Sequence, residues 1–499
     1  DPEMSRGLGD VYKRQILMYS VPLMLSNVLQ VMFNLCDVAV VGKFVGPLAL
    51  GAVGSTSIII TLTTGILLGL AGGVNAVVAL FVGAKNSANV KKAVHTSIVI
   101  CMIAGLLLLL SGLFLSRPVL NLIGTKKELI DGAVIYLTIY LLGSPALAMY
   151  NYGNAVLSAV GDTKRPLMYL ITAGIINVVL NLFFVIVCRL GVVGVALASI
   201  ISQYISAFLI LKFLFGCGKD YGLYITNIGM DSHIAARVLK IGLPAAVQYS
   251  LFAVANLYIQ TAVNSFDHVV VEGNSAAANA DNIVYDMMAA FYTACTSFIA
   301  QNLGARKRDR IRKAYLVTQM YSFIIGAVLG ALLVVFRTQF LSLFTSDPDV
   351  LHYGSIRLGI MGCSYFVSAF MDNAAAGARG LGRSVIPTII VIMGSVVFRI
   401  IWVCTIFASI HTLMSLYLVY ASAWAFTSII GTVYFIIIYR KTLRYSRTFY
   451  KNFTNTRLCI LHNIDNIPSA SRCRGFSFLR RLTYHSVRKL IQAPMKIFC

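Results

Sequence analysis

Twelve long apolar stretches constrain the fold of this chain more than any other feature. A helix needs about 20 apolar residues to cross the hydrocarbon core of a bilayer. Backbone polar groups inside lipid must be satisfied within the segment, so each stretch is expected to be a helix. The stretches cover residues 16–41, 50–82, 93–115, 133–157, 166–189, 192–215, 241–265, 274–302, 314–336, 352–377, 386–408 and 412–439.

The composition excludes a soluble globular protein and a disordered one. Charged residues make up 12% of the chain, whereas soluble domains carry about 25%. The mean hydropathy is +0.81. The sequence therefore predicts an all-α polytopic membrane protein with twelve transmembrane helices. We expect these helices to be embedded in the lipid bilayer.

Charges in the loops predict how the chain is oriented. The loops of one side hold 17 Lys and Arg, and those of the other side hold seven. The positive-inside rule places the first set in the cytoplasm. An even number of spans then puts both termini in the cytoplasm. The seven cations assigned to the outer side are Lys43, Arg117, Lys126, Lys127, Arg189, Arg337 and Arg357.

About half of the net charge of +23 lies in one segment. Residues 440–499 carry 13 Lys and Arg and one acid, Asp465. Much of the remaining charge belongs to the orientation signal, so no nucleic-acid partner is expected. We expect residues 441–499 to form a basic, disordered cytoplasmic tail. Residues 1–15 lack an apolar core and are expected to be a non-homologous leader rather than a signal peptide.

The chain repeats itself at an offset of 221 to 222 residues. The matching pairs are Gly83 and Gly304, Ala84 and Ala305, Lys85 and Arg306, Lys91 and Arg312, Gly161 and Gly382, Pro166 and Pro387, Pro22 and Pro244, and Asn34 and Asn256. The repeat predicts two pseudo-symmetric six-helix lobes, residues 16–215 and 237–440, joined by the cytoplasmic loop 216–236. Parallel repeats within one chain are typical of transporters. Because both lobes lie in one chain, we expect a monomer.

Signals for catalysis and for cofactors are weak. The Gly-rich segment from Gly377 to Gly382 has no βαβ context, and no Walker A, HExxH or GxSxG sequence occurs. The ten Cys include no CxxC pair. We therefore expect no enzyme activity, no cofactor and no metal site. Energy for transport would come from an ion gradient.

Five charged residues lie well inside the apolar stretches. They are Asp37, Asp281, Asp286, Asp372 and Arg399. A charge at the centre of the bilayer costs several kcal/mol unless it is paired or faces water. Such residues are functional candidates, and buried structural ion pairs are the alternative.

Four polar residues of the first lobe are predicted to lie at similar depth. Asp37, Asn181 and Ser199 are all about 6–12 Å from the outer surface, from the helical rise of about 1.5 Å per residue. Asn177 and Asn181 share one helix face. A carboxylate, two amides and a hydroxyl suit a proton or a hard cation such as Na⁺, and the residues do not choose between them. Hydrogen bonding between helices is the alternative interpretation.

The second lobe is richer in aromatic and acidic residues. Asp281, Tyr285 and Asp286 occur in one stretch and are candidates for binding organic cations by charge and cation–π contact. Asp372 and Arg399 have opposite charges, but their expected depths differ by several residues. All five are candidate residues of the substrate cavity.

Several motifs in order resemble the multidrug and toxic compound extrusion (MATE) family, most closely its bacterial DinF-like branch. The resemblance covers residues 16–440. The motifs include residues 21–23, 34–37 and 46–54, Gly161-Asp162-Thr163-Lys164-Arg165-Pro166, residues 191–196, Gly242-Leu243-Pro244, residues 301–305, Arg379-Gly380-Leu381-Gly382, Met371-Asp372 and residues 399–402.

The resemblance implies a two-lobe antiporter of a bacterial inner membrane. It would export amphipathic, often cationic compounds in exchange for H⁺ or Na⁺. The family's ion-coupling residues correspond to Asp37, Asn177 and Ser199. Asn181 stands where the family has a second Asp, which removes one charge. Gln248 lies near the place where some relatives carry a Glu.

Two other functions remain open at this stage. A lipid-linked saccharide flippase of the wider superfamily would need several cations in its cavity, and only Arg399 is expected there. A membrane-embedded lipid enzyme would need a catalytic cluster, and the sequence offers none.

Overall fold

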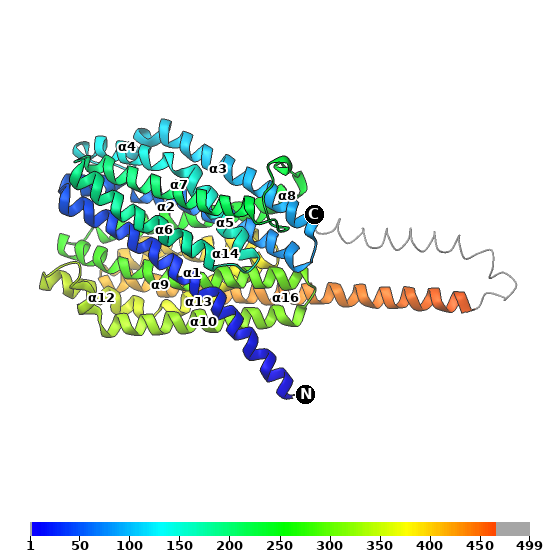
Figure 1. Ribbon diagram of the computed structural model, residues 1–499. Coiled ribbons are helices and arrows are strands. Elements are labelled where there is room, and N and C mark those ends of the chain that lie inside the picture. Colours follow the sequence, from blue (N-terminus) through cyan, green and yellow to red (C-terminus); the bar gives the residue numbers. More distant parts are fainter. Residues whose placement is uncertain (1, 466–499) are drawn as a thin grey trace. The chain divides into compact units, whose positions relative to one another are not determined.

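The computed structural model describes residues 2–465, and these fold into helices joined by short turns (Figure 1). The elements are α1 (Pro2–Phe44), α2 (Pro47–Gly83), α3 (Ser87–Leu122), α4 (Lys127–Leu142), α5 (Ser144–Ala159), α6 (Lys164–Leu182), α7 (Gly191–Gly216), α8 (Ser232–Val263), α9 (His268–Gly304), α10 (Arg308–Val335), α11 (Arg337–Leu341), α12 (Pro348–Gly362), α13 (Tyr365–Gly380), α14 (Val385–Val391), α15 (Phe398–Trp402) and α16 (Leu413–Asp465). Short π-helical segments follow α6, α14 and α15, at Phe183–Val187, Ile392–Val397 and Val403–Phe407.

The long apolar helices confirm the predicted polytopic membrane fold. Ten helices of the described chain are long and apolar enough to cross a bilayer. The bent pair α4 and α5 makes an eleventh span, with an angle of 44° between its halves. The break follows Gly143, and Pro145 stands in the first turn of α5, where a missing N–H costs no helical hydrogen bond.

The predicted span 352–377 is two helices rather than one. α12 ends at Gly362 and α13 begins at Tyr365. This pair does not meet the length and hydropathy expected of a span, because α13 is rich in Ala and Gly and also carries Asp372 and Arg379. Most of α13 is nevertheless buried inside the protein, where its polar groups avoid lipid.

Helix boundaries repeat along the chain and confirm the two-lobe arrangement. Adding 221 to the bounds of α2 gives those of α9, and the same shift takes α5 to α13. The break between α4 and α5 recurs between α12 and α13. Each predicted lobe therefore has the same order of spans, including a broken fourth span, although the second lobe also has the short helix α11 and a π-helical segment between α14 and α15.

The two central helices are α2 and α9, the most buried of the spans. They approach each other closely where each ends. A Cβ on Gly83 would lie 2.0 Å from the carbonyl oxygen of Gln301, and a Cβ on Gly304 would lie 2.0 Å from that of Leu80. The two contacts are equivalent under the repeat. Only glycine permits this approach, so the pseudo-two-fold relation passes through the α2–α9 contact.

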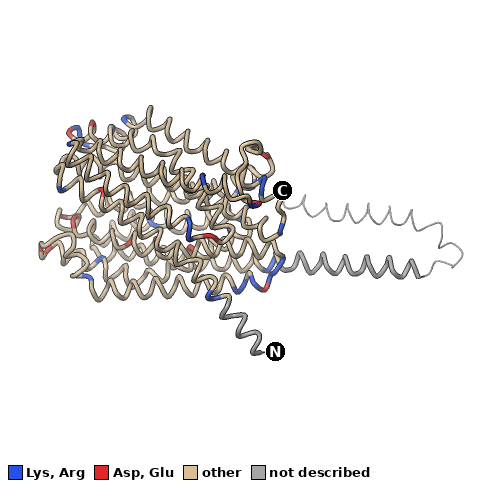
Figure 2. Tube along the Cα trace, viewed as in Figure 1, with Lys and Arg blue, Asp and Glu red and all other residues tan. Residues whose placement is uncertain are grey.

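Most charged residues lie at the two ends of the long helices (Figure 2). Asp231 illustrates how they are used. Its carboxylate accepts hydrogen bonds from the backbone N–H groups of Ile234 and His233, and Lys92 donates to it at 3.2 Å. These hydrogen bonds, that of Ile234 foremost, lower the pKa of Asp231. The cap begins α8 and ties it to α3.

The chain divides into two compact units, Asp1–Phe435 and Ile436–Cys499. Residues 441–465, which we assigned to the tail, continue helix α16. The disorder predicted for residues 466–499 falls outside the described residues. The leader expected at residues 1–15 is the beginning of α1, which starts at Pro2.

Candidate functional site

The four polar residues predicted to lie together in the first lobe form one cluster. Asp37 comes from α1, Asn177 and Asn181 from α6, and Ser199 from α7. Ser199 Oγ donates to Asp37 Oδ2 at 2.9 Å, and Asn181 Nδ2 donates to Asp37 Oδ1. Asn181 Nδ2 also contacts Asn177 Oδ1 at 3.2 Å. We call these four residues the Asp37 cluster.

The Asp37 cluster is buried and carries a single formal charge. Asp37 is 8% exposed and Asn181 is 0% exposed. Within the described chain, no Lys, Arg or His forms an ion pair with Asp37. Val41, one helical turn after Asp37, and Val195, one turn before Ser199, belong with Val53 to one buried apolar cluster. A carboxylate in such surroundings is stabilised by a proton or by a bound cation.

One acceptor in the Asp37 cluster has no partner among the residues that the structure describes. Asn181 Oδ1 is buried and makes no hydrogen bond, although Asn181 Nδ2 is fully used. An unsatisfied buried acceptor is costly and calls for a donor or a cation. The oxygens of Asp37, Asn181, Asn177 and Ser199 are of the kind that a hard cation prefers.

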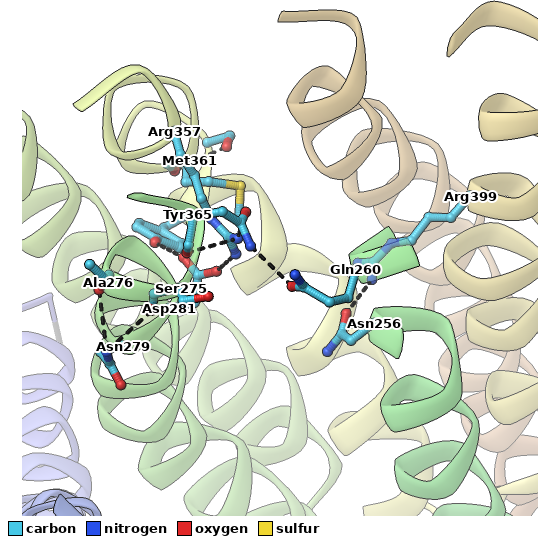
Figure 3. A network of polar contacts seen from close by, with 12 residues as sticks. Asn256, Gln260, Ser275, Ala276, Asn279, Asp281, Arg357, Met361, Tyr365 and Arg399 are labelled. Atoms are coloured by element: carbon cyan, nitrogen blue, oxygen red, sulfur yellow. Dashed lines mark hydrogen bonds and ion pairs between the residues drawn. The ribbon is translucent and has the colours of Figure 1, made fainter. Parts of the chain in front are cut away.

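Asp281 of the second lobe, a predicted cavity residue, is already paired. Its carboxylate accepts hydrogen bonds from Arg357 and from the Tyr365 hydroxyl (Figure 3). Arg357 also donates to Asn274, whose Nδ2 donates to Gln260 Oε1 at 3.1 Å. These five residues form a connected polar network that joins α9, α12, α13 and α8, in which the Nε of Arg357 has no partner among the described residues.

Arg357 is not the outer-loop cation that the sequence analysis assigned. It lies inside α12 and is 5% exposed. The expectation that Arg399 is the only cation inside the spans is therefore wrong. The sequence did contain the information needed, because Arg357 falls within the predicted span 352–377.

Three other predicted residues of the substrate cavity are not part of this network. Asp372 of α13 is 3% exposed, and its Oδ2 has no hydrogen-bond partner. Asp286 of α9 is partly buried, and its backbone oxygen accepts from Asn27 at 2.8 Å. Tyr285 is 38% exposed, with its ring 6.4 Å from that of Tyr292. The three residues come from adjoining helices, but their side chains do not contact one another in the described hydrogen bonds.

Arg399 is the second buried cation of this lobe. It does not form an ion pair with Asp372 among the described residues. One terminal nitrogen donates to Asn256 Oδ1 at 3.1 Å. The guanidinium lies 4.5 Å from the ring centre of Tyr420 and 5.8 Å from that of Phe252. Its Nε has no partner. The sequence analysis did not identify Asn256 as a partner, although its match to Asn34 in the repeat was visible.

A polar cluster also bridges the two lobes near the α2–α9 contact. Tyr19 Oη of α1 donates to the Ser158 carbonyl at 3.0 Å and lies 2.9 Å from Ser297 Oγ of α9. Ser297 donates to Asn75 at 2.7 Å, and Gln301 donates to the Ala159 carbonyl at 2.7 Å. The two lobes are therefore joined at the end that carries the basic loops.

Comparisons with known proteins agree on one family. The MatE family model matches residues 22–183 and 244–405, one match in each lobe. The probable multidrug resistance protein YpnP of Bacillus subtilis is 32% identical over 349 residues, 69% of this chain and 77% of that protein. YoeA of the same organism, also named a probable multidrug resistance protein, is 28% identical over 76% of this chain and 83% of its own length.

Solved structures show the same fold. An outward-facing MATE family multidrug resistance transporter of the MOP superfamily superposes with a TM-score of 0.81. It is 21% identical and covers 87% of this chain and 97% of its own. At that identity the likeness supports the architecture only.

Proposed function

Because the chain belongs to the MatE family of membrane transporters, we propose that it is a secondary active antiporter. It exports amphipathic, often cationic compounds in exchange for H⁺ or Na⁺ by alternating access of its two lobes. The multidrug resistance names of YpnP and YoeA support this substrate class. The observation that carries the ion coupling is the Asp37 cluster, which combines a buried carboxylate without a cationic partner and a free acceptor at Asn181.

The coupling step follows from the charge of the Asp37 cluster. With Asp37 ionised and unoccupied, one negative charge is held among apolar side chains, which favours a conformation that exposes it to water. A proton or Na⁺ removes the net charge, and the cluster then tolerates closure. Each ion therefore favours one lobe arrangement over the other, which is the condition for exchange.

To release the compound outside, the two lobes must separate first at the cytoplasmic end and then at the outer end of the protein. In this proposal the end with Tyr19, Asn75 and Ser297 is cytoplasmic, and its hydrogen bonds hold the protein closed to that side. The basic loops support an orientation with both termini in the cytoplasm, and the bacterial relatives support a location in the inner membrane. Opening toward the cytoplasm exchanges these hydrogen bonds for bonds to water.

Efflux from proteoliposomes tests the proposal. A fluorescent cationic dye such as ethidium is loaded, and either a pH gradient or a Na⁺ gradient is imposed. We expect one gradient to drive efflux. Asp37→Asn should abolish the driven component while the reconstituted amount is unchanged, because the coupling charge is gone. Asp267→Asn, the same substitution at an exposed position before α9, is the matched control and should behave as the wild type.

Driven efflux that persists in Asp37→Asn would contradict the assignment of the coupling residue. An absence of transport under either gradient, with folded protein, would instead favour the flippase alternative. Arg357 does not strengthen that alternative, because its charge is neutralised by Asp281.

A further inference from the structure

Arg399 is a buried cation that the protein leaves incompletely paired. It is 3% exposed, and the five described ion pairs do not include it. Its one side-chain acceptor is the neutral amide of Asn256, and its Nε is unpartnered. Asp281 and Asp372 act on it through space, but neither carboxylate is within ion-pair distance. A charge inside a membrane protein is costly without a close counter-charge.

Arg357 shows that the same lobe can pair a buried arginine with an acid when its role is structural, although its Nε, like that of Arg399, has no partner among the described residues. Its guanidinium donates to Asp281 and to Asn274, and it lies 5.8 Å from the same Tyr420 ring that Arg399 contacts. The difference between the two arginines is therefore the missing acid at Arg399. A group supplied from outside the chain would complete the second site.

The position of Arg399 corresponds to that of the Asp37 cluster in the other lobe. The Asp37 cluster is built from α1, α6 and α7. Arg399 and its contacts come from α8, from α15 within the span that repeats α6, and from α16. Tyr420 is the repeat of Ser199 at the offset of 221. The two lobes thus place opposite charges in equivalent helix triplets.

Asn256 gives this site a route to water. It is exposed, although it lies inside the apolar helix α8, about two turns before the helix ends at Val263. An exposed amide inside a span is expected to face an aqueous or substrate-filled space rather than lipid. In Figure 3 the Asn256 side chain stands beside Arg399, away from the group of Asp281, Arg357 and Tyr365. An incoming acceptor can therefore replace Asn256 Oδ1 on the guanidinium.

We propose that Arg399, with Asn256 as its acceptor in the empty state, binds a carboxylate or phosphate group of the amphipathic compound that the protein exports. The inference rests on the proposed export function and names the chemistry of one end of the substrate. Arginine suits this task because its planar donor set matches carboxylate and phosphate oxygens. The rings of Tyr420 and Phe252 hold the guanidinium in place while the acceptor changes.

Equilibrium binding of a matched dye pair tests the inference. Rhodamine 110 carries a free carboxylate, and rhodamine 123 is its methyl ester with the same aromatic body. Binding to purified full-length protein in phosphatidylcholine nanodiscs is followed by fluorescence anisotropy. Arg399→Gln should weaken rhodamine 110 binding about tenfold or more, the scale of a lost charge-assisted hydrogen bond. Rhodamine 123 binding should change less than about twofold.

A second variant keeps Arg399 and fills its site. Asn256→Asp supplies a tethered carboxylate to the guanidinium and should also weaken rhodamine 110 selectively. Asn34→Asp is the matched control, because Asn34 is the repeat of Asn256 in the first lobe and is exposed. It adds the same charge away from Arg399 and should have little effect. Arg399→Lys should retain part of the selectivity.

Equal changes for both dyes, or no change in Arg399→Gln and Asn256→Asp, would overturn the inference. Equal weakening by Asn34→Asp and Asn256→Asp would also overturn it, since general repulsion would then explain the result. The same dye-binding measurement in nanodiscs that contain phosphatidylglycerol tests whether a lipid headgroup occupies the site. Loss of rhodamine 110 selectivity there would assign the site to a lipid headgroup instead of a substrate. These outcomes are independent of whether an ion gradient drives efflux.

Discussion

At the scale of single residues, two arginines buried in the second lobe have different surroundings. This difference distinguishes a structural role for Arg357 from a ligand-binding role for Arg399. Arg357 is held by Asp281 and Asn274, whereas Arg399 has a neutral amide and aromatic rings. Removing one partner of a buried ion pair leaves an uncompensated charge, which is more costly than replacing both. We therefore expect Asp281 to stabilise the lobe rather than to bind substrate.

Replacement of Arg357 tests that assignment. Arg357→Met should destabilise the protein by about 3 kcal/mol, because Asp281, whose side chain is 23% exposed, is left partly buried without its counter-charge. Adding Asp281→Asn should recover much of the loss. Thermal unfolding in detergent, followed by intrinsic fluorescence, measures both variants. If Asp281 were instead a free substrate ligand, the single variant would keep its stability and lose only dye binding.

The residues of the Asp37 cluster could be predicted because their grouping depends on local rules. Asn177 and Asn181 share a face through their spacing of four, and the depth of Asp37 and Ser199 follows from the ends of the spans. The pairing of Arg357 with Asp281 could not be predicted in this way. It depends on where α12 ends and how α12 packs on α9, which are tertiary features.

At the scale of elements, the hydrophobic pattern predicted which segments cross the membrane but not where they break. An average over 20 residues hides the interruption at Cys363 and Ser364, because apolar residues stand on both sides of it. The repeat could not reveal this break, because the equivalent stretch 133–157 was also predicted as one helix and its break at Gly143 appears only in the structure. The break is compatible with lipid because α13 is mostly buried by its neighbours.

The contact between α2 and α9 leads to a prediction for helix packing. Gly83→Ala introduces a Cβ where the carbonyl oxygen of Gln301 is 2.0 Å away. The helices must separate at this end, and the equilibrium should shift toward the open arrangement. Spin labels can be attached to cysteines introduced at Ala88 and Asp309 in a cysteine-free background. Double electron–electron resonance spectroscopy should then show a longer distance between these labels.

Gly54→Ala is the matched control for this prediction. Gly54 lies on the same helix, and a Cβ there meets nothing within 4 Å. It should leave the label distance unchanged. A wild-type distance in Gly83→Ala would mean that α2 and α9 do not form the rigid contact on which the closed end depends.

At the scale of the whole molecule, the repeat predicted two lobes in one chain. The hydrogen bonds that join the two lobes at the end with the basic loops could not be predicted. The hydrogen bonds of Tyr19, Ser297 and Gln301 belong to one of at least two arrangements that alternating access requires. Each such bond is worth about 0.5–1.5 kcal/mol net. A few of them can hold an end closed and still be outweighed when an ion binds the Asp37 cluster of the first lobe.

This balance gives a prediction for the response of the lobes to ions. In the wild type, the distance between labels at Ala88 and Asp309 should change when H⁺ or Na⁺ is raised, since the bound cation removes the charge of Asp37. Asp37→Asn is already neutral at this position, so its distance should be fixed and insensitive to either ion. Asp267→Asn should respond as the wild type does. If Asp37→Asn still responded, the cation that moves the lobes would bind elsewhere, and the acids Asp286 and Asp372 of the second lobe would be the residues to substitute next.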